Sequence, residues 1–198
     1  MDEIQKRKQN ASWYFQTIFE LLTSTQVTGC RGDDFSLNDG GDQAAQMILG
    51  LLVTGNKAMV IGNGGSAALA SHTHNDLCKS VGVPSLVFTE VPILTAMTND
   101  NGYKTAFKYQ VDLWAKPSDL LIAISSSGRS ENILYAAQAA LEHGCHLITL
   151  SGFRADNPLR NMGDLNFYVQ FEDYGYVESA HAVLLHFLTD RAIILKKA

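Results

Sequence analysis

The sequence predicts one α/β domain, in which a doubly wound, mostly parallel five-stranded sheet is flanked by helices. Short apolar runs recur along the chain, helical patterns separate them, and two of the runs end in loops rich in glycine or serine. The chain has 198 residues, of which 46% are hydrophobic and 18% are charged. This length and composition suit one globular domain and are short for two.

The first quarter of the chain precedes the predicted strands. Apolar residues at helical spacing in residues 3–24, including Trp13, Ile18 and Leu22, predict a long amphipathic helix. Residues 28–41 are rich in glycine and aspartate and predict a surface loop, and a second helix is expected from about Asp42 to Val53. We therefore expect residues 1–198 to form a single domain with an N-terminal helical extension over about residues 1–53.

The strands are expected where aliphatic residues form short buried runs. These runs are residues 58–61, 85–88, 120–124, 147–150 and 167–169. The stretch from about Val177 to Leu195 has no glycine or proline and predicts a long closing helix. In a sheet of this kind the ligand site lies beyond the carboxyl ends of the strands, where loops lead into helices.

Composition also argues against several classes of protein. The net charge of −5 is spread along the chain, and no cluster of Lys and Arg with aromatic residues indicates a nucleic-acid partner. No apolar run approaches the ~20 residues of a membrane span, and the N-terminal residues lack the apolar core of a signal peptide. The three cysteines contain no CxxC pair, so neither a disulfide framework nor a zinc ribbon is indicated. We expect a cytoplasmic protein with no membrane partner.

Two loops at strand ends carry groups that suit an anion. The first, Ile61 to Ser66, ends the run at 58–61 and leads into a helix over about residues 67–79. The second, residues 125–130 with the sequence SSSGRS, follows the run at 120–124 and places Ser130 as the N-cap of the next helix. Hydroxyl groups and free amides at a helix N-terminus favour a phosphate. Each loop taken alone could also be no more than a turn with capping residues.

A dinucleotide-binding fold is an alternative interpretation of the first loop. Gly62, Gly64 and Ala67 satisfy the loose GxGxxA pattern, and Glu90 follows the next strand. Glu90 lies later than the ~20 residues expected for a ribose-binding acid, however, and this pattern leaves the second loop unexplained. A Walker loop is excluded because the GK[ST] sequence is missing.

The two loops, together with a C-terminal helix that carries spaced histidines, resemble the SIS (sugar isomerase) family, specifically its phosphoheptose isomerases. The resemblance runs from about Ala58 to the C-terminus and includes residues 98–100, which look like the family's GND segment. It implies the flavodoxin-like SIS fold and a homotetramer, or at least a dimer, with sites shared between subunits. The residues that it assigns to the sugar phosphate are Asn63, Gly64, Gly65, Ser66, Asn99, Asp100, Ser125, Ser126, Ser127, Ser130 and Glu178.

The resemblance implies an enzyme that interconverts sedoheptulose 7-phosphate and a D-glycero-D-manno-heptose 7-phosphate. Such a reaction moves a proton between adjacent carbons through an enediol, and so needs a base and a proton donor. His72 and Asp76 are four residues apart and share a helix face, whereas His74 points nearly opposite. On the last helix, Glu178 and His186 are about two turns apart and can face the same cleft.

Two imidazoles and two carboxylates could hold a zinc ion with an open position, and the zinc could polarise the substrate's oxygens. Zinc-containing phosphoheptose isomerases use a histidine and an acid on the first helix with a glutamine and a histidine on the last. These match His72, Asp76, Glu178 and His186, which implies one zinc per subunit, Asp76 as the base and His186 as the acid.

Two of these positions depart from the family's pattern. Asp76 stands where the family usually has glutamate, and Glu178 stands where it has glutamine. The shorter aspartate retracts its carboxylate by one methylene, and a displacement of ~1 Å can cost on the order of a hundredfold in rate. The departures therefore bear directly on catalysis.

Two other functions stay open at this point. One is a non-catalytic SIS module that binds a sugar phosphate or a partner protein, as the replication-initiator-associating relatives do. The other is an isomerase of a different sugar phosphate, such as a pentose, a hexose or a heptose of secondary metabolism. The presence of His72, His186 and an acid at position 76 favours chemistry, because a docking protein has no need for convergent ionisable side chains.

Overall fold

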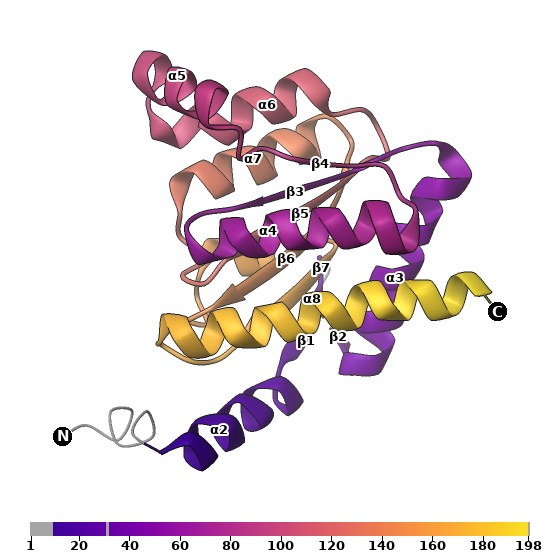
Figure 1. Cartoon of the computed structure of the whole chain (residues 1–198), viewed down its shortest axis with the longest axis vertical. Helices are drawn as coiled ribbons and strands as arrows, with labels where there is room; N and C mark the ends of the chain where they lie inside the picture. The colour runs from indigo at the N-terminus through magenta and orange to yellow at the C-terminus, as the bar shows by residue number, and fades with distance from the viewer. Residues whose placement is uncertain (1–9, 31, 198) are drawn as a thin grey trace.

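The computed structural model describes residues 10–30 and 32–197 and has one seven-stranded sheet at its centre (Figure 1). The strands lie in the order β2-β1-β7-β6-β5-β3-β4. Five of them pair in parallel, as predicted: β3 (Ala58–Gly62), β4 (Ser85–Val87), β5 (Leu120–Ser125), β6 (His146–Gly152) and β7 (Leu165–Val169). Their side chains are mostly buried, because helices cover both faces of the sheet.

The predicted number of five strands was wrong, because a hairpin ahead of these strands adds two more. The strands β1 (Gln26–Gly29) and β2 (Asp34–Phe35) pair with each other in antiparallel fashion, and β1 pairs in the same way with β7. Most of this hairpin lies within residues 28–41, which were predicted to be a surface loop. Val27 is buried in the core, so packing against β7 and α3 overrides the local turn signals.

Helices cover both faces of the sheet (Figure 1). The helices α3 (Leu37–Thr54), α4 (Gly65–Asp76) and α8 (Tyr174–Lys197) lie on one face, and α5 (Val91–Asn101), α6 (Ala106–Trp114) and α7 (Glu131–Glu142) lie on the other. Alternate strand residues supply the two halves of the core. Val60 and Ile122 pack with α3 and α8, whereas Met59 and Leu121 pack with α6 and α7.

Helix α3 begins at Leu37, about five residues earlier than predicted. Ser36 caps it, because the Ser36 hydroxyl accepts a hydrogen bond from the Asp39 amide at 3.1 Å and donates one to the Asp39 carboxylate at 2.6 Å. Gly40 lies in the first turn, where a Cβ would come within 2.5 Å of a Val27 methyl group. This glycine therefore serves close packing of α3 against the hairpin.

The predicted N-terminal helix is present as α2 (Ala11–Thr23) within the described residues, and residues 3–9 of that prediction lie outside them. The ring of Tyr14 stacks on the ring of Tyr176 with 4.5 Å between centroids, which connects α2 to the beginning of α8. Among the described helices, none is long and apolar enough to cross a membrane.

Helix α4 continues directly into a π-helical turn, η1 (Leu77–Val81). Gly82 ends this turn in the left-handed region, with φ of 84°, and Lys196 near the end of α8 donates a hydrogen bond to the Val81 carbonyl at 2.6 Å. The π turn begins at the residue after Asp76, so Asp76 occupies the last position of the regular helix. Turns of this kind are frequent at functional sites.

The direction of chain progression across the sheet reverses at β3. The chain passes from β3 to β4 on one side, and then to β5, β6 and β7 on the other. In open α/β sheets a ligand crevice forms at such a switch point, outside the carboxyl ends of the strands. The loops that follow β3 and β5 are the two glycine- and serine-rich loops.

Candidate active site

The two loops line one cleft of about 250 Å³ at the switch point of the sheet. We call residues 125–130 the serine loop and this cleft the serine-loop cleft. Helix α4 starts at Gly65 on one side of the cleft, and α7 follows Ser130 on the other. The cleft is lined by Asn63, Gly64, Gly65, Ser66, Ile124, Ser125, Ser126, Ser127, Ser130, Tyr174 and Glu178. The structure therefore brings together every predicted substrate-binding residue except Asn99 and Asp100.

Hydroxyl groups and helix amides dominate the cleft. The Ser126 hydroxyl is buried and has no hydrogen-bond partner among the residues that the structure describes. Leaving such a group unsatisfied costs roughly 1–3 kcal/mol, which an oxygen of a bound ligand would relieve. The lining residues include no lysine or arginine, so an anion in this cleft would be held by hydroxyl groups and by the N-termini of α4 and α7.

The Asn63 side chain is held by two residues that the sequence did not indicate. Asn63 and Asn132 exchange amide hydrogen bonds in both directions at 2.8 Å, and the Tyr103 hydroxyl donates to Asn63 Oδ1 at 2.6 Å. Asn132 is buried on α7, and Tyr103 follows α5. No spacing rule connects these distant positions in the sequence. The local signal for this contact is Asn132, a polar residue on the otherwise apolar face of α7.

Asn99 and Asp100 lie elsewhere in this chain. Both are exposed near the end of α5, where the Asn99 amide donates to the Asp100 carboxylate at 2.9 Å. Neither residue lines the serine-loop cleft. Their predicted contact with the sugar chain stays a prediction.

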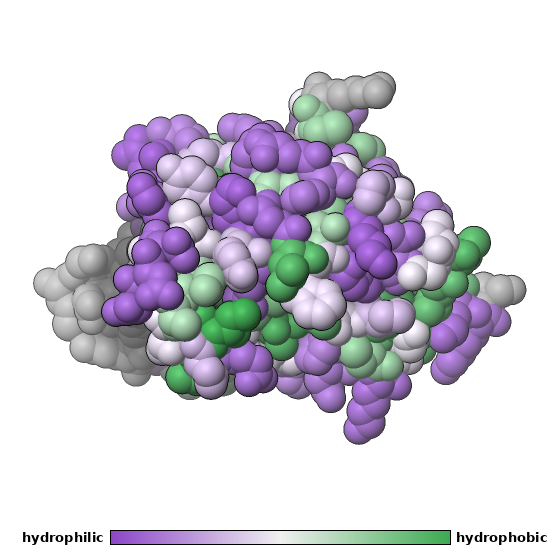
Figure 2. Space-filling model, turned by 90° about the horizontal axis from the view of Figure 1, so that it is seen from above, coloured by the Kyte–Doolittle hydropathy of each residue, from purple (hydrophilic) through white to green (hydrophobic). Residues whose placement is uncertain are grey.

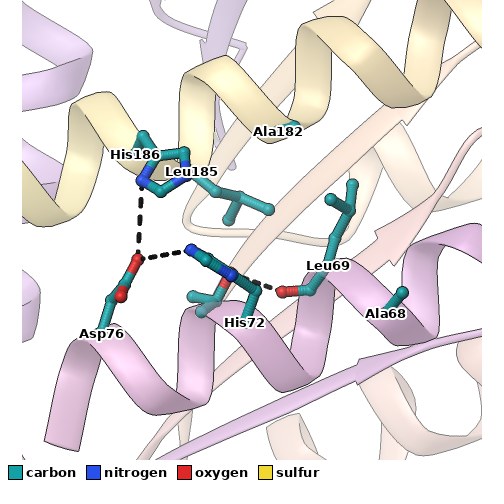
Figure 3. Close-up of a pocket in the computed structure, with 8 residues that line it drawn as sticks. Ala68, Leu69, His72, Asp76, Ala182, Leu185 and His186 are labelled. Atoms are coloured by element: carbon teal, nitrogen blue, oxygen red, sulfur yellow. Dashed lines mark hydrogen bonds and ion pairs between the residues drawn. The ribbon is translucent and has the colours of Figure 1, made fainter. Parts of the chain in front are cut away.

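A second pocket, of about 300 Å³, lies between α4 and α8 and contains a cluster of ionisable side chains (Figure 3). We call His72, Asp76 and His186 the His–Asp–His cluster. One carboxylate oxygen of Asp76 lies 3.3 Å from His72 Nε2 and 3.5 Å from His186 Nδ1. The other residues that line this pocket are Ala68, Leu69, Thr73, Ala182 and Leu185.

Helix geometry explains the cluster. His72 and Asp76 are four residues apart on α4, so their side chains lie on the same face, as predicted. His186 comes from α8, which runs beside α4 in the same direction. The Asp76 side chain is 18% exposed, whereas His72 and His186 are 57% and 54% exposed, so both imidazoles stay accessible to a ligand.

Glu178 lies apart from the other three predicted metal ligands. Its carboxylate packs against Gly65 at the beginning of α4, where a Cβ would collide with it. The eight residues from Glu178 to His186 span about 12 Å along the helix axis. Glu178 thus lies with the predicted substrate-binding residues in the serine-loop cleft.

The His–Asp–His cluster has a donor set that fits a metal ion. Each of its residues offers one ligand atom, and these atoms all lie within 4.8 Å of one another. Two imidazoles and a carboxylate are typical of catalytic zinc sites, which use three protein ligands and keep one position open. His74 lies outside the cluster and contacts Cys78 instead, in agreement with its predicted orientation.

His181 lies between Glu178 and His186 in the sequence but belongs to neither pocket. Its side chain is fully buried, and its Nε2 is 3.1 Å from the backbone carbonyl oxygen of Ser151. Burial lowers the pKa of His181 to about 4, although the hydrogen bond to Ser151 acts in the opposite direction. The imidazole is therefore neutral at neutral pH.

Comparisons with known proteins agree with this architecture. Residues 36–152 match the sequence profile of the SIS domain. The phosphoheptose isomerase of Syntrophotalea carbinolica is 36% identical over 154 residues, which cover 75% of this chain and 78% of that protein. The solved phosphoheptose isomerase of Neisseria gonorrhoeae has a TM-score of 0.79 at 28% identity, covering 96% of this chain and 98% of that one. The enzyme of Francisella tularensis has a TM-score of 0.78 at 26% identity, covering 97% and 98%.

Proposed function

The chain belongs to the SIS domain family, and from its likeness to the phosphoheptose isomerases we propose that it interconverts sedoheptulose 7-phosphate and a D-glycero-D-manno-heptose 7-phosphate. The observation that carries the proposal is that α4 and α8 border two sites of complementary chemistry. A phosphate-type cleft lies at the beginning of α4, and the His–Asp–His cluster lies further along the same two helices.

The serine-loop cleft is the proposed site of the phosphate. Amides at the N-termini of α4 and α7 favour a dianion, and the hydroxyl of Ser126 is available to bond one of its oxygens. The Ser125 and Ser130 hydroxyls lie 3.4 Å apart, close enough to bind one phosphate oxygen together. Glu178 in the same cleft would accept hydrogen bonds from sugar hydroxyl groups.

In the proposed reaction Asp76 takes the proton from one of the two reacting carbons and returns it to the other. His186 donates a proton to the carbonyl oxygen on which negative charge develops, and then takes a proton from the neighbouring hydroxyl oxygen, which becomes the new carbonyl oxygen. A zinc ion held by His72, Asp76 and His186 would polarise the substrate's oxygens. The aspartate is shorter than the family's glutamate, but its position beside two imidazoles provides the polar environment that a catalytic carboxylate needs.

Distance along α4 supports a site that is completed by a second copy of the chain. From Ser66 to Asp76 the helix rises about 15 Å. The six carbon–carbon bonds of a heptose and the two bonds that join it to phosphorus, at about 1.5 Å each, span at most about 12 Å. The reacting carbons of a sugar bound in one cleft would therefore meet the His–Asp–His cluster of a neighbouring subunit, and we propose a homotetramer, or at least a dimer.

The test is turnover of a panel of ketose and aldose phosphates, with and without added zinc. We expect sedoheptulose 7-phosphate to be the best ketose substrate, and Asp76→Asn to lower kcat by roughly 10²–10⁴, because an amide cannot accept the proton. Asp112→Asn is the matched control, because Asp112 also pairs with a histidine, at 3.1 Å, but lies outside both pockets.

The same preparations give the metal content. We expect about one zinc ion per subunit after expression with zinc, and loss of that ion in His186→Ala but not in His143→Ala. Binding of a sugar phosphate without turnover, in protein that carries its metal, would instead indicate a non-catalytic sugar-phosphate module. Preferred turnover of a pentose or hexose phosphate would replace the heptose as substrate.

A further inference from the structure

His181 is a buried imidazole that the proposed reaction does not use. It lies on α8 three residues after Glu178 and five residues before His186, and its side chain has no exposed surface. Because its Nε2 faces a carbonyl oxygen, which can only accept, Nε2 carries the hydrogen and donates it. Its Nδ1 is then an acceptor, and it has no hydrogen-bond partner within the described part of the chain.

The Ser151 carbonyl, which accepts the hydrogen bond from His181, connects α8 to the strand beside the serine loop. His181 donates to the Ser151 carbonyl, and Ser151 on β6 pairs in register with Ser125 on β5, the first residue of the loop. The Ser151 hydroxyl also accepts a hydrogen bond from the Asn157 amide at 3.3 Å. This hydrogen bond therefore joins α8 to the sheet at the level where the loop begins.

A buried polar layer continues from Ser151 beneath the loop itself. Asn157 is fully buried and fills the space under Gly128, which has a φ of 61° and no room for a Cβ. The Gly128 carbonyl accepts a hydrogen bond from the Leu159 amide at 3.2 Å. His181, Ser151, Asn157 and Gly128 thus form a continuous layer from α8 to the serine loop.

An apolar side chain would fill the position of His181 without burying an unpaired acceptor. Burial of such an atom is unfavourable, so packing alone does not account for an imidazole here. Thr189 is a buried polar residue on the same helix. Its hydroxyl hydrogen-bonds to the backbone carbonyls of Leu185 and His186, which belong to α8 itself. His181 differs because its hydrogen bond crosses from α8 to the sheet.

We propose that His181 is a positioning residue, which sets α8, and with it Glu178 and His186, at a fixed distance from the serine loop. The proposal rests on the proposed function, because it assigns the loop to the phosphate and His186 to the chemistry. A neutral imidazole suits this task, since burial keeps it from charging at neutral pH.

The test compares two substitutions in the full-length, metal-loaded protein. His181→Leu keeps apolar volume but removes the donor, whereas His181→Gln retains an amide N–H that can reach the Ser151 carbonyl. Thr149→Val is the matched control. It removes another buried hydrogen bond of β6, the one at 2.7 Å to Asn166, without affecting α8.

We expect His181→Leu to lower kcat with sedoheptulose 7-phosphate at least tenfold, because a small displacement of His186 acts on the reacting atoms, and to raise KM as well, because Glu178 in the cleft moves with the same helix. His181→Gln should recover most of kcat, and Thr149→Val should keep it. Retention of kcat in His181→Leu, or an equal loss in the leucine and glutamine variants, would overturn the proposal.

A spectroscopic measurement separates this proposal from the isomerase assignment. The ring signals of His186 in the NMR spectrum should shift in His181→Leu, return toward the wild type in His181→Gln, and stay unchanged in Thr149→Val. If the wild type turns over no sugar phosphate, the isomerase assignment has failed. The His186 signals alone then test whether His181 positions α8. Unchanged His186 signals in His181→Leu would then contradict the positioning role.

Discussion

Burial controls the charge of the residue at position 181. It lowers the pKa of His181 from the ordinary 6.5 to about 4, and the hydrogen bond to Ser151 offsets only part of this effect. The unfolded chain therefore takes up a proton near pH 6.5, whereas the folded protein takes it up only near pH 4. Between these two values the unfolded state binds more protons, so the stability of the fold decreases as the pH falls.

We expect the free energy of unfolding to decline from pH 6.5 to pH 4, and His181→Gln to make this decline shallower by up to about 3 kcal/mol. Urea unfolding at several pH values measures the slope. His146→Gln is the control for loss of a histidine side chain, because His146 is exposed at the beginning of β6 and takes no part in the buried layer around His181. An unchanged slope in His181→Gln would show that His181 is not buried as a neutral group.

Pairs of residues within one helix were predictable from the sequence, whereas contacts between distant segments were not. The meeting of His72 with Asp76 follows from the helical period alone. For Glu178 and His186, the spacing indicates only that both can face the same side, and their axial separation of about 12 Å places them in different pockets. The contacts of Asn63 with Asn132 and Tyr103 depend on tertiary packing, which leaves no periodic pattern.

At the scale of the elements, the buried parallel strands were the most predictable. The strands β3, β5 and β6 appear as continuous aliphatic runs, because they are covered on both faces. The hairpin of β1 and β2 left no such signal, since β2 has two residues and its pairing depends on β7. The sequence Ser36-x-x-Asp39 is the capping signal that would have given the start of α3.

The serine loop owes its shape to a glycine that a larger residue cannot replace. We expect Gly128→Ala to destabilise the protein by about 1–3 kcal/mol and to raise KM, because its φ is 61° and a Cβ would collide with Asn157. Gly50→Ala on α3 is the control. A Cβ there meets no atom within 4 Å, so this helix position should gain about 0.5–1 kcal/mol. Thermal unfolding together with KM measures both, and a normal KM in Gly128→Ala would contradict the phosphate assignment of the loop.

At the scale of the whole molecule, large hydrophobic side chains are exposed on helices at the surface. Figure 2 shows the side on which α5 and α6 lie, with hydrophobic groups between hydrophilic ones. On α6, Leu113 and Trp114 are at least half exposed, and on α2 Phe15 and Phe19 are also more than half exposed. Side chains of this size are enriched where a second protein surface covers them, which agrees with the proposed self-association.

Mixing of two inactive variants tests whether sites are shared between subunits. The double variant Ser127→Ala/Ser130→Ala should impair phosphate binding in the serine-loop cleft. Asp76→Asn should impair proton transfer at the His–Asp–His cluster. If a cleft works with a neighbour's cluster, assemblies that contain both variants should regain activity at low substrate concentration, above the sum of the parents. Light scattering should show that the mixed species exceed the mass of a monomer. A monomer, or mixed assemblies without regained activity, would contradict the shared site.

Helix α8 follows the other described helices and strands in the chain, and this order affects how the fold emerges from the ribosome. Helix α8 covers the apolar face formed by α3, α4 and the sheet, and it supplies both Glu178 and His186. Until its 24 residues have been synthesised, that face stays open to water, for at least a second or so at about 5–20 residues per second. The nascent chain is therefore most exposed to aggregation just before α8 is made, and a chain cut before α8 would present a chaperone substrate rather than a folded, partly active protein.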